Sequence, residues 1–80
     1  MIWVLIPVYN EAAGIPKMLQ ETRNAIAAFG EFRMVLVDDG STDETCITIQ
    51  RELRQSDHLI SLEHNSGPGA AFLAGFEFIL

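Results

Sequence analysis

The most informative part of the sequence is residues 34–41, which read MVLVDDGS. Its first four residues are apolar without a break, which is typical of a strand buried on both faces in a parallel sheet. Asp38 and Asp39 follow this run directly, and Gly40 and Ser41 continue as a turn. Two adjacent carboxylates at the end of a buried strand repel each other and lose hydration, so they require hydrogen-bond donors, a metal or a ligand. The stretch therefore predicts a buried strand that ends at a polar site.

The rest of the chain repeats this arrangement. Residues 2–6 form a short apolar run that ends at Pro7, and residues 59–62 form a third run with partial alternation. Apolar residues recur at helical spacing over residues 15–29, 46–53 and 70–80. Strands that alternate with helices in the order β-α-β-α-β-α predict an α/β fold with a Rossmann-like parallel sheet and right-handed crossovers.

Polar residues follow each of the three strands, at residues 7–11, 38–43 and 64–69. Parallel strands place their carboxyl ends at one edge of the sheet, and the ligand crevice of an open α/β sheet lies at that edge. We therefore expect the three polar groups to meet there and to form a binding site.

The first polar group offers an aromatic ring and a carboxylate. Tyr9 can stack on a flat nucleobase, an interaction of about 1–3 kcal/mol per base in single-strand binders, or it can be a half-buried turn residue. Asn10 and Glu11 can cap the following helix, and Glu11 can instead accept hydrogen bonds from ribose hydroxyls. The local sequence leaves these alternatives open.

The second group is the aspartate pair and its turn. Adjacent side chains on an extended backbone point opposite ways, so Asp38 and Asp39 are expected to divide their roles. One fixes the loop and the other accepts a hydrogen bond from a base N–H, or else both only cap the turn and the next helix. Ser41 and Glu44 have the spacing of a capping box, and Asp43 also favours a helix N-terminus.

The third group contains Asn65 and Gly67, which permit a close backbone approach to a ligand or form a plain strand-to-helix turn. No second histidine or cysteine lies at metal-ligand spacing from His64, so a zinc site is not expected. The chain also lacks the glycine-rich phosphate loops of the Gly-x-x-x-x-Gly-Lys and Gly-x-Gly-x-x-Gly types.

The length and composition of the chain argue against several classes of protein. The 80 residues allow one small domain, and a formal net charge of −6 with only five basic residues, scattered along the sequence, argues against a nucleic-acid partner. The single cysteine, Cys46, cannot form a disulfide within the chain, which favours a reducing compartment. No apolar run approaches the roughly 20 residues that a membrane span requires. We expect a cytoplasmic protein, with any membrane association supplied by regions after Leu80.

Three motifs together resemble family 2 glycosyltransferases, which have the GT-A fold. They are IPVYNE at residues 6–11, VLVDDGSTDET at residues 35–45 and NSGPGAA at residues 65–71, and Gly75 follows. The resemblance covers essentially the whole chain, and the three motifs occur in the family's order at the three strand ends. It implies that residues 1–80 form the nucleotide-binding subdomain, the N-terminal half of a GT-A fold, cut off within the third helix.

The resemblance also implies roles for individual residues. In the family, the tyrosine of the first motif packs at the uracil or guanine ring, and the glutamate lies beside the nucleoside. The second aspartate of the Asp-Asp-Gly-Ser turn contacts the base, and the third motif lines the pocket near the ribose. The expected nucleotide-binding residues are therefore Pro7, Tyr9, Glu11, Asp39, Asn65 and Gly67.

The implied reaction is the transfer of a sugar from a UDP- or GDP-linked donor to an acceptor. The stretch Gly67–Ala70 is similar to enzymes that glycosylate polyprenyl phosphates, which are membrane lipid carriers. The family's Asp-x-Asp motif, which holds Mg²⁺ or Mn²⁺, follows the next strand, so we expect no catalytic or metal-binding residue within this chain. These 80 residues alone are expected to be inactive.

Two other classes of protein use related patterns. A phosphoacceptor receiver domain has its aspartate pair after the first strand and an acceptor aspartate after the third, whereas here the pair follows the second strand and His64 follows the third. This order argues against a receiver. A catalytically inactive nucleotide-binding or interaction module stays open, because the residues that would carry out transfer are not among the 80.

Overall fold

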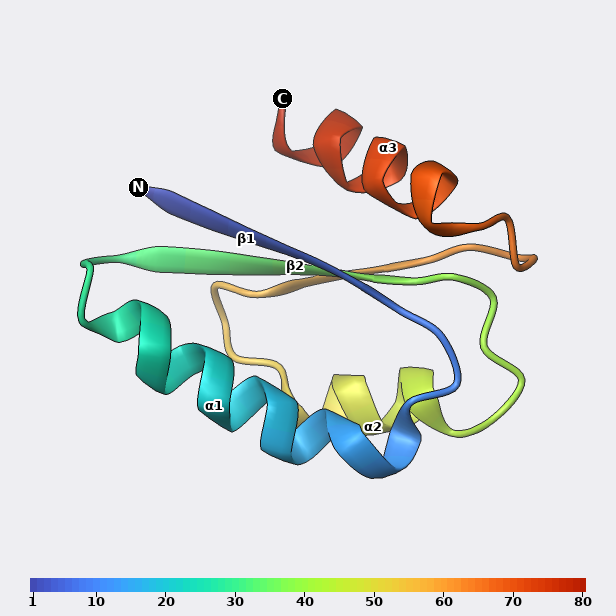
Figure 1. The fold of residues 1–80 in the computed structure, drawn as a ribbon, viewed down its shortest axis with the longest axis horizontal. Helices are drawn as coiled ribbons and strands as arrows, with labels where there is room; N and C mark the ends of the chain where they lie inside the picture. Colours follow the sequence, from blue (N-terminus) through green and yellow to red (C-terminus); the bar gives the residue numbers. More distant parts are fainter.

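The computed structural model describes residues 1–80 and shows one parallel sheet with helices on both faces (Figure 1). The strand order is β1-β2-β3, with β2 in the centre. This is the predicted Rossmann-like α/β arrangement. The elements in chain order are β1 (Ile2–Val8), a single 3-10 turn η1 (Ala12–Gly14), α1 (Ile15–Ala27), β2 (Phe32–Asp38), α2 (Thr45–Glu52), β3 (His58–Ser61) and α3 (Pro68–Ile79).

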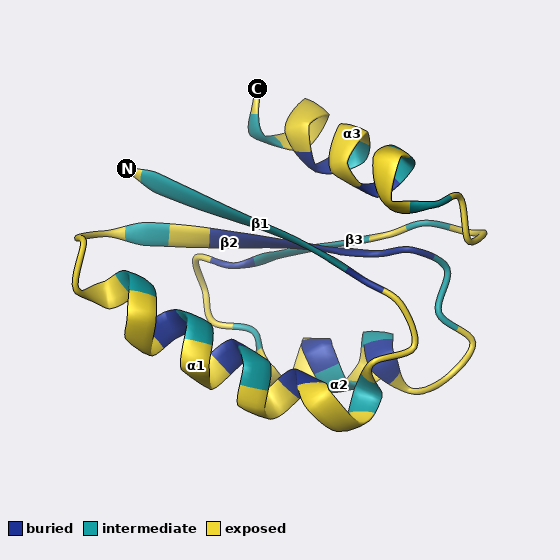
Figure 2. Ribbon diagram, viewed as in Figure 1, coloured by how far each residue is buried: buried dark blue, intermediate teal, exposed yellow.

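The central strand β2 is buried on both faces, as its unbroken apolar run predicts. Met34 and Leu36 point to the side of α1 and α2, and Val35 and Val37 point to the side of α3. All four side chains are fully buried, and Figure 2 shows most of the strand in the colour of buried residues. Because α1 and α2 cover one face and α3 covers the other, β2 joins two separate apolar cores.

The element boundaries differ from the predicted ones by one or two residues. Helix α1 ends at Ala27 rather than Phe29, and Gly30 beyond it adopts φ +124°. Strand β3 begins at His58, one residue early. Helix α3 begins at Pro68 rather than Ala70, because a proline suits the first helical turn, where no N–H is required.

Helix α3 lies very close to β1. A Cβ atom at Gly75 would lie 2.1 Å from Cδ1 of Leu5, so any larger residue would force the Leu5 side chain or the helix to move. On its other side α3 leaves large apolar side chains exposed, among them Leu73 at 59% and Phe76 at 54%. No helix is both long enough and apolar enough to cross a bilayer.

The contact between α3 and β1 gives a test of the packing. Gly75→Ala should be less stable than Gly69→Ala by about 1–3 kcal/mol, because the added methyl group overpacks the core at residue 75 only. Gly69 lies in the same helix, and a Cβ atom there would have no neighbour within 4 Å, so its replacement keeps the helix-propensity gain without a clash. Urea unfolding of both variants measures the difference, and equal stabilities would contradict the packing of α3 on Leu5.

Candidate functional site

The two aspartates at the end of β2 are both buried, with Asp38 exposed by 3% and Asp39 by 5%. Oδ1 of Asp38 accepts hydrogen bonds from the backbone N–H of Ser41 at 3.2 Å and from the Ser41 hydroxyl. The two oxygens of Asp39 accept from the backbone N–H groups of Ser66 at 2.8 Å and Gly67 at 3.0 Å. The two carboxylates reach different loops, as their alternation on the strand predicts: Asp38 holds the second loop and Asp39 holds the third. Both therefore fix a loop, whereas only one of them was expected to do so.

The capping box predicted at Ser41 and Glu44 is wrong, because the Ser41 side chain is used by Asp38 and the N-cap residue Glu44 makes no side-chain capping bond. Asp43 acts at the start of α2 instead, where it accepts from the Thr45 N–H at 2.9 Å and from the Thr45 hydroxyl. That hydroxyl, helped by backbone N–H groups, holds the pKa of the Asp43 carboxyl below its usual value against the opposing effect of burial.

Asn10 does not cap the first helix, contrary to the capping interpretation, since neither η1 nor α1 has a side-chain cap. Its backbone adopts φ +50°, which is uncommon for a residue other than glycine but tolerated by asparagine. Its N–H donates to Oγ of Ser41 at 2.8 Å, and its Oδ1 accepts from the Thr42 N–H at 2.9 Å. The side chain therefore fastens the first strand-end loop to the second.

A further bond joins the same two loops. The N–H of Glu11 donates to Oγ1 of Thr45 at 2.8 Å, and Thr45 is fully buried. This threonine was not expected to matter, because nothing in its local sequence distinguishes it from an ordinary residue at the start of a helix. Thr45 and the partners of Asn10 together fix the backbone of the two residues that follow Tyr9.

Three of the six expected residues meet at one small hollow of about 150 Å³ at the carboxyl ends of β1 and β2. Pro7, Tyr9 and Asp39 line it, together with Val8, Pro68 and Ala71, which sequence reasoning did not single out. Tyr9 is 41% exposed, so part of its ring is open to solvent. The hollow thus presents a ring, a carboxylate and apolar walls.

The other three expected residues lie outside this hollow. Glu11 lines a neighbouring hollow of about 230 Å³ with Pro7, and its Oε2 would lie 3.7 Å from a Cβ at Gly14. Gly67, with φ +92°, is bonded to Asp39 through its N–H, and Asn65 is exposed on the same loop. That third loop approaches the second closely, because a Cβ at Gly40 would lie 2.4 Å from the backbone carbon of His64.

Each carboxylate of the aspartate pair already accepts hydrogen bonds from loop N–H groups or a hydroxyl, and the two hold different loops. No group of three or more His, Cys, Asp or Glu side chains lies close enough together to hold a metal ion.

Comparison with known proteins identifies the family of this chain. The family described as "Glycosyl transferase family 2" matches residues 3–79, which include all three strand-end loops. The chain belongs to glycosyltransferase family 2. Its three-stranded sheet, with the polar loops at the carboxyl edge, is the N-terminal part of this family's GT-A fold.

Within the glycosyltransferase family, this chain is similar to proteins named undecaprenyl-phosphate 4-deoxy-4-formamido-L-arabinose transferase. It is 41% identical to those of Pseudomonas paraeruginosa and Pseudomonas aeruginosa over 81 residues, which is 96% of this chain and 24% of theirs. It is also 41% identical to that of Pseudomonas fluorescens over 78 residues, 92% of this chain and 23% of the relative. The chain spans about a quarter of the length of these relatives.

The hydrogen bonds that join Asn10 to Ser41 and Thr42 connect the first two loops of this glycosyltransferase chain, and substitutions at Asn10 test them. Asn10→Asp keeps the accepting oxygen and tolerates a positive φ, so it should remain close to the wild type in enough salt to screen the added charge. Asn10→Gly keeps only the backbone freedom and should lose about 1 kcal/mol, the usual net value of one hydrogen bond. Urea unfolding and hydrogen exchange at the Thr42 amide measure both effects. Equal stability and equal Thr42 protection in the two variants would show that the Asn10 side chain does not hold the second loop.

Proposed function

We propose that this chain forms the nucleotide-binding part of a glycosyltransferase that takes a sugar from a UDP- or GDP-linked donor. The observation that carries the proposal is the shared hollow of Pro7, Tyr9 and Asp39 at the carboxyl edge of the sheet. In an open α/β sheet this edge is where ligands bind. A ring face next to a fixed carboxylate suits a nucleobase, which has a flat π surface and N–H donors at its rim.

In the proposed complex the base stacks on Tyr9, and Asp39 accepts a hydrogen bond from a base N–H. Asp39 is already bonded to Ser66 and Gly67, but each carboxylate oxygen has two acceptor sites and each uses one for the loop. The two backbone bonds therefore orient the carboxylate and leave it able to accept again. Because Asp39 is held by the protein before the ligand arrives, little ordering is required on binding.

The ribose is proposed to lie towards the remaining expected residues. Glu11 can accept hydrogen bonds from ribose hydroxyls, and Asn65 and Gly67 border the third loop, where the glycine leaves room for a sugar. The donor's diphosphate is anionic and the chain carries a net charge of −6, so its charge requires an offset. We propose that Mg²⁺ or Mn²⁺ supplies this offset, with ligands outside these 80 residues.

The acceptor is proposed to be a polyprenyl phosphate. The similar Pseudomonas proteins are named for transfer involving undecaprenyl phosphate, and the identity over this region is 41%. A cytoplasmic site at a membrane surface fits such an acceptor, whose phosphate lies at the lipid–water boundary.

The binding proposal is tested by calorimetric titration of UDP and GDP into the chain. Tyr9→Ala should weaken binding by roughly tenfold, because stacking contributes about 1–3 kcal/mol, whereas Tyr9→Phe should be nearly silent. Asp39→Ala should weaken binding by roughly tenfold or more, through the lost bond to the base and through release of the third loop. Phe29→Ala is the matched control, since Phe29 is an aromatic side chain with 76% exposure that lines none of the hollows at this edge. Unchanged affinity in both Tyr9→Ala and Asp39→Ala would exclude this edge as the base pocket.

An assay of sugar transfer tests whether these 80 residues are catalytically active by themselves. We expect the purified 80-residue chain to show no turnover with a panel of UDP- and GDP-sugars and Mn²⁺, because the metal ligands and the catalytic base are proposed to lie elsewhere. Turnover above background that disappears in Asp39→Ala would show that these residues suffice for the chemistry.

A further inference from the structure

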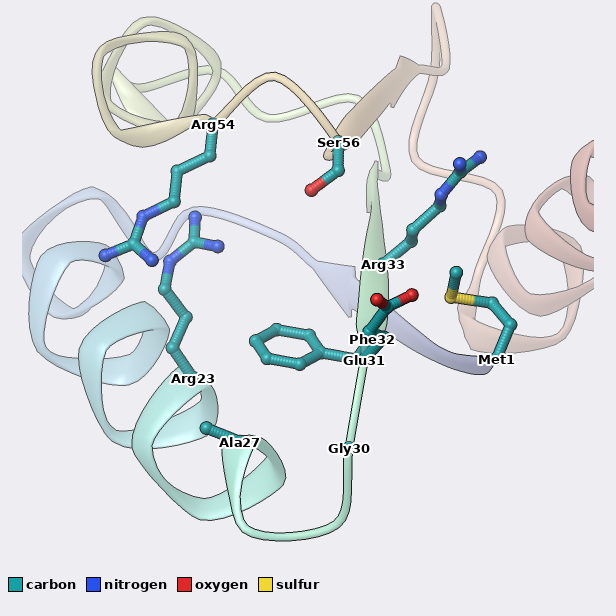
Figure 3. Close-up of a pocket in the computed structure, with 9 residues that line it drawn as sticks. All are labelled: Met1, Arg23, Ala27, Gly30, Glu31, Phe32, Arg33, Arg54 and Ser56. Carbon is teal, nitrogen blue, oxygen red and sulfur yellow. The ribbon is translucent and has the colours of Figure 1, made fainter.

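Three arginines gather at the amino-terminal edge of the sheet, opposite the candidate nucleotide site. Arg23 comes from α1, Arg33 from the start of β2, and Arg54 from the connection between α2 and β3. They line an open hollow of about 490 Å³ (Figure 3). The chain has only five basic residues and a net charge of −6, and these arginines are scattered in the sequence, so the fold itself produces this concentration of positive charge.

Arg23 is held rigidly at one wall of the hollow. Only 8% of the residue is exposed, and its Nη2 donates to Oδ2 of Asp57 at 2.6 Å and to the backbone oxygen of Glu52 at 3.2 Å. Burial pushes the pKa of Asp57 up, but hydrogen bonds from Arg23 and the Arg54 backbone N–H outweigh it and leave this pKa below its usual value. A guanidinium has five N–H donors in a planar fork, and the Nε and Nη1 donors of Arg23 have no partner in the protein.

Arg54 lies next to this fixed fork. Its backbone N–H donates to the same Asp57 oxygen at 2.9 Å, and Arg54 lines the same two hollows as Arg23. Figure 3 shows the two guanidinium groups on the same side of the hollow, with Ser56 on the rim. The Arg54 side chain makes no ion pair with any carboxylate, although Glu31 and Glu52 border this hollow and the next one.

Two guanidinium groups on one side of a hollow repel each other, and an anion that contacts both converts this repulsion into attraction. Phosphate suits the position, because the arginine fork matches its oxygens in a bidentate manner. Arg33 lies on the far side of the hollow, with its guanidinium 5.8 Å from the Trp3 ring centroid and no ion-pair partner. It adds positive charge at longer range.

We propose that Arg23 and Arg54 form a binding site for a phosphate group at the amino-terminal edge of the sheet, with the Ser56 hydroxyl as a further donor. The site is separate from the Tyr9–Asp39 hollow and does not depend on the proposed transfer reaction. The phosphate group belongs either to a soluble phosphate compound or to a phospholipid headgroup.

Inorganic phosphate is the probe for the first source. Titration at low salt, followed by NMR, should give saturable shifts at the amides of Arg54 and Ser56. Arg54→Ala should weaken binding by roughly tenfold, because it removes charge-assisted hydrogen bonds from a side chain that the fold does not otherwise use. Arg51→Ala is the matched control: it removes the same charge from α2, at a residue that lines none of the hollows, and should leave the affinity unchanged.

Vesicles distinguish the second source. If the ligand is a headgroup, the chain should sediment with phosphatidylcholine vesicles that contain phosphatidylglycerol, and Arg54→Ala but not Arg51→Ala should abolish this. Phosphate binding without vesicle binding identifies a soluble phosphate compound. The proposal is overturned if neither probe binds, or if Arg51→Ala weakens binding as much as Arg54→Ala, since net charge alone would then explain the effect.

Discussion

The hydrogen bonds of Asp38 and Asp39 are the constraint on which the polar edge of this molecule depends. The two carboxylates end the central strand, are almost fully buried, and each accepts bonds from a different loop. Charged groups at this depth destabilise a fold unless donors surround them, so the loops and the carboxylates require each other. Asp38 reaches the first loop indirectly, because the Ser41 side chain that it holds also accepts from the Asn10 N–H.

This arrangement gives the two edges of the sheet different chemistry. At the carboxyl edge, buried carboxylates organise backbone N–H groups and leave a small hollow with an aromatic side. At the amino edge, Asp57 holds the Arg23 side chain and the Arg54 backbone at a wider hollow. In both places a buried carboxylate accepts hydrogen bonds from segments that are far apart in the sequence. The central strand β2 connects the two edges through a core that is apolar on both faces.

Much of the fold could be predicted because it depends on the spacing of apolar residues within short segments of the sequence. The unbroken run of Met34–Val37 predicts a doubly buried strand, and the helical period over residues 15–29 predicts α1. The meeting of the strand ends follows from parallel topology alone, and so did the expectation that Pro7, Tyr9 and Asp39 would lie near one another. These features depend on the period and order of elements, which neighbouring residues determine.

What could not be predicted depends on partners distant in sequence. Asn10 bonds to a residue 31 positions away and Glu11 to one 34 positions away, so local spacing suggested only a helix cap for Asn10. The hydrogen bonds from Ser66 and Gly67 to Asp39 were also not predicted, because the path of the third loop decides which N–H groups reach the Asp39 carboxylate. The arginine cluster was hidden for the same reason, since Arg23 and Arg54 meet only after both crossovers have formed.

Hydrogen exchange at the third loop tests the central role of the aspartate pair most directly. The amides of Ser66 and Gly67 lie in an exposed loop and have only the Asp39 carboxylate as acceptor, while the amides of His64 and Asn65 have no acceptor. NMR-detected exchange should therefore show slow exchange at residues 66 and 67 and fast exchange at residues 64 and 65. Fast exchange at all four amides would show that Asp39 does not hold the third loop.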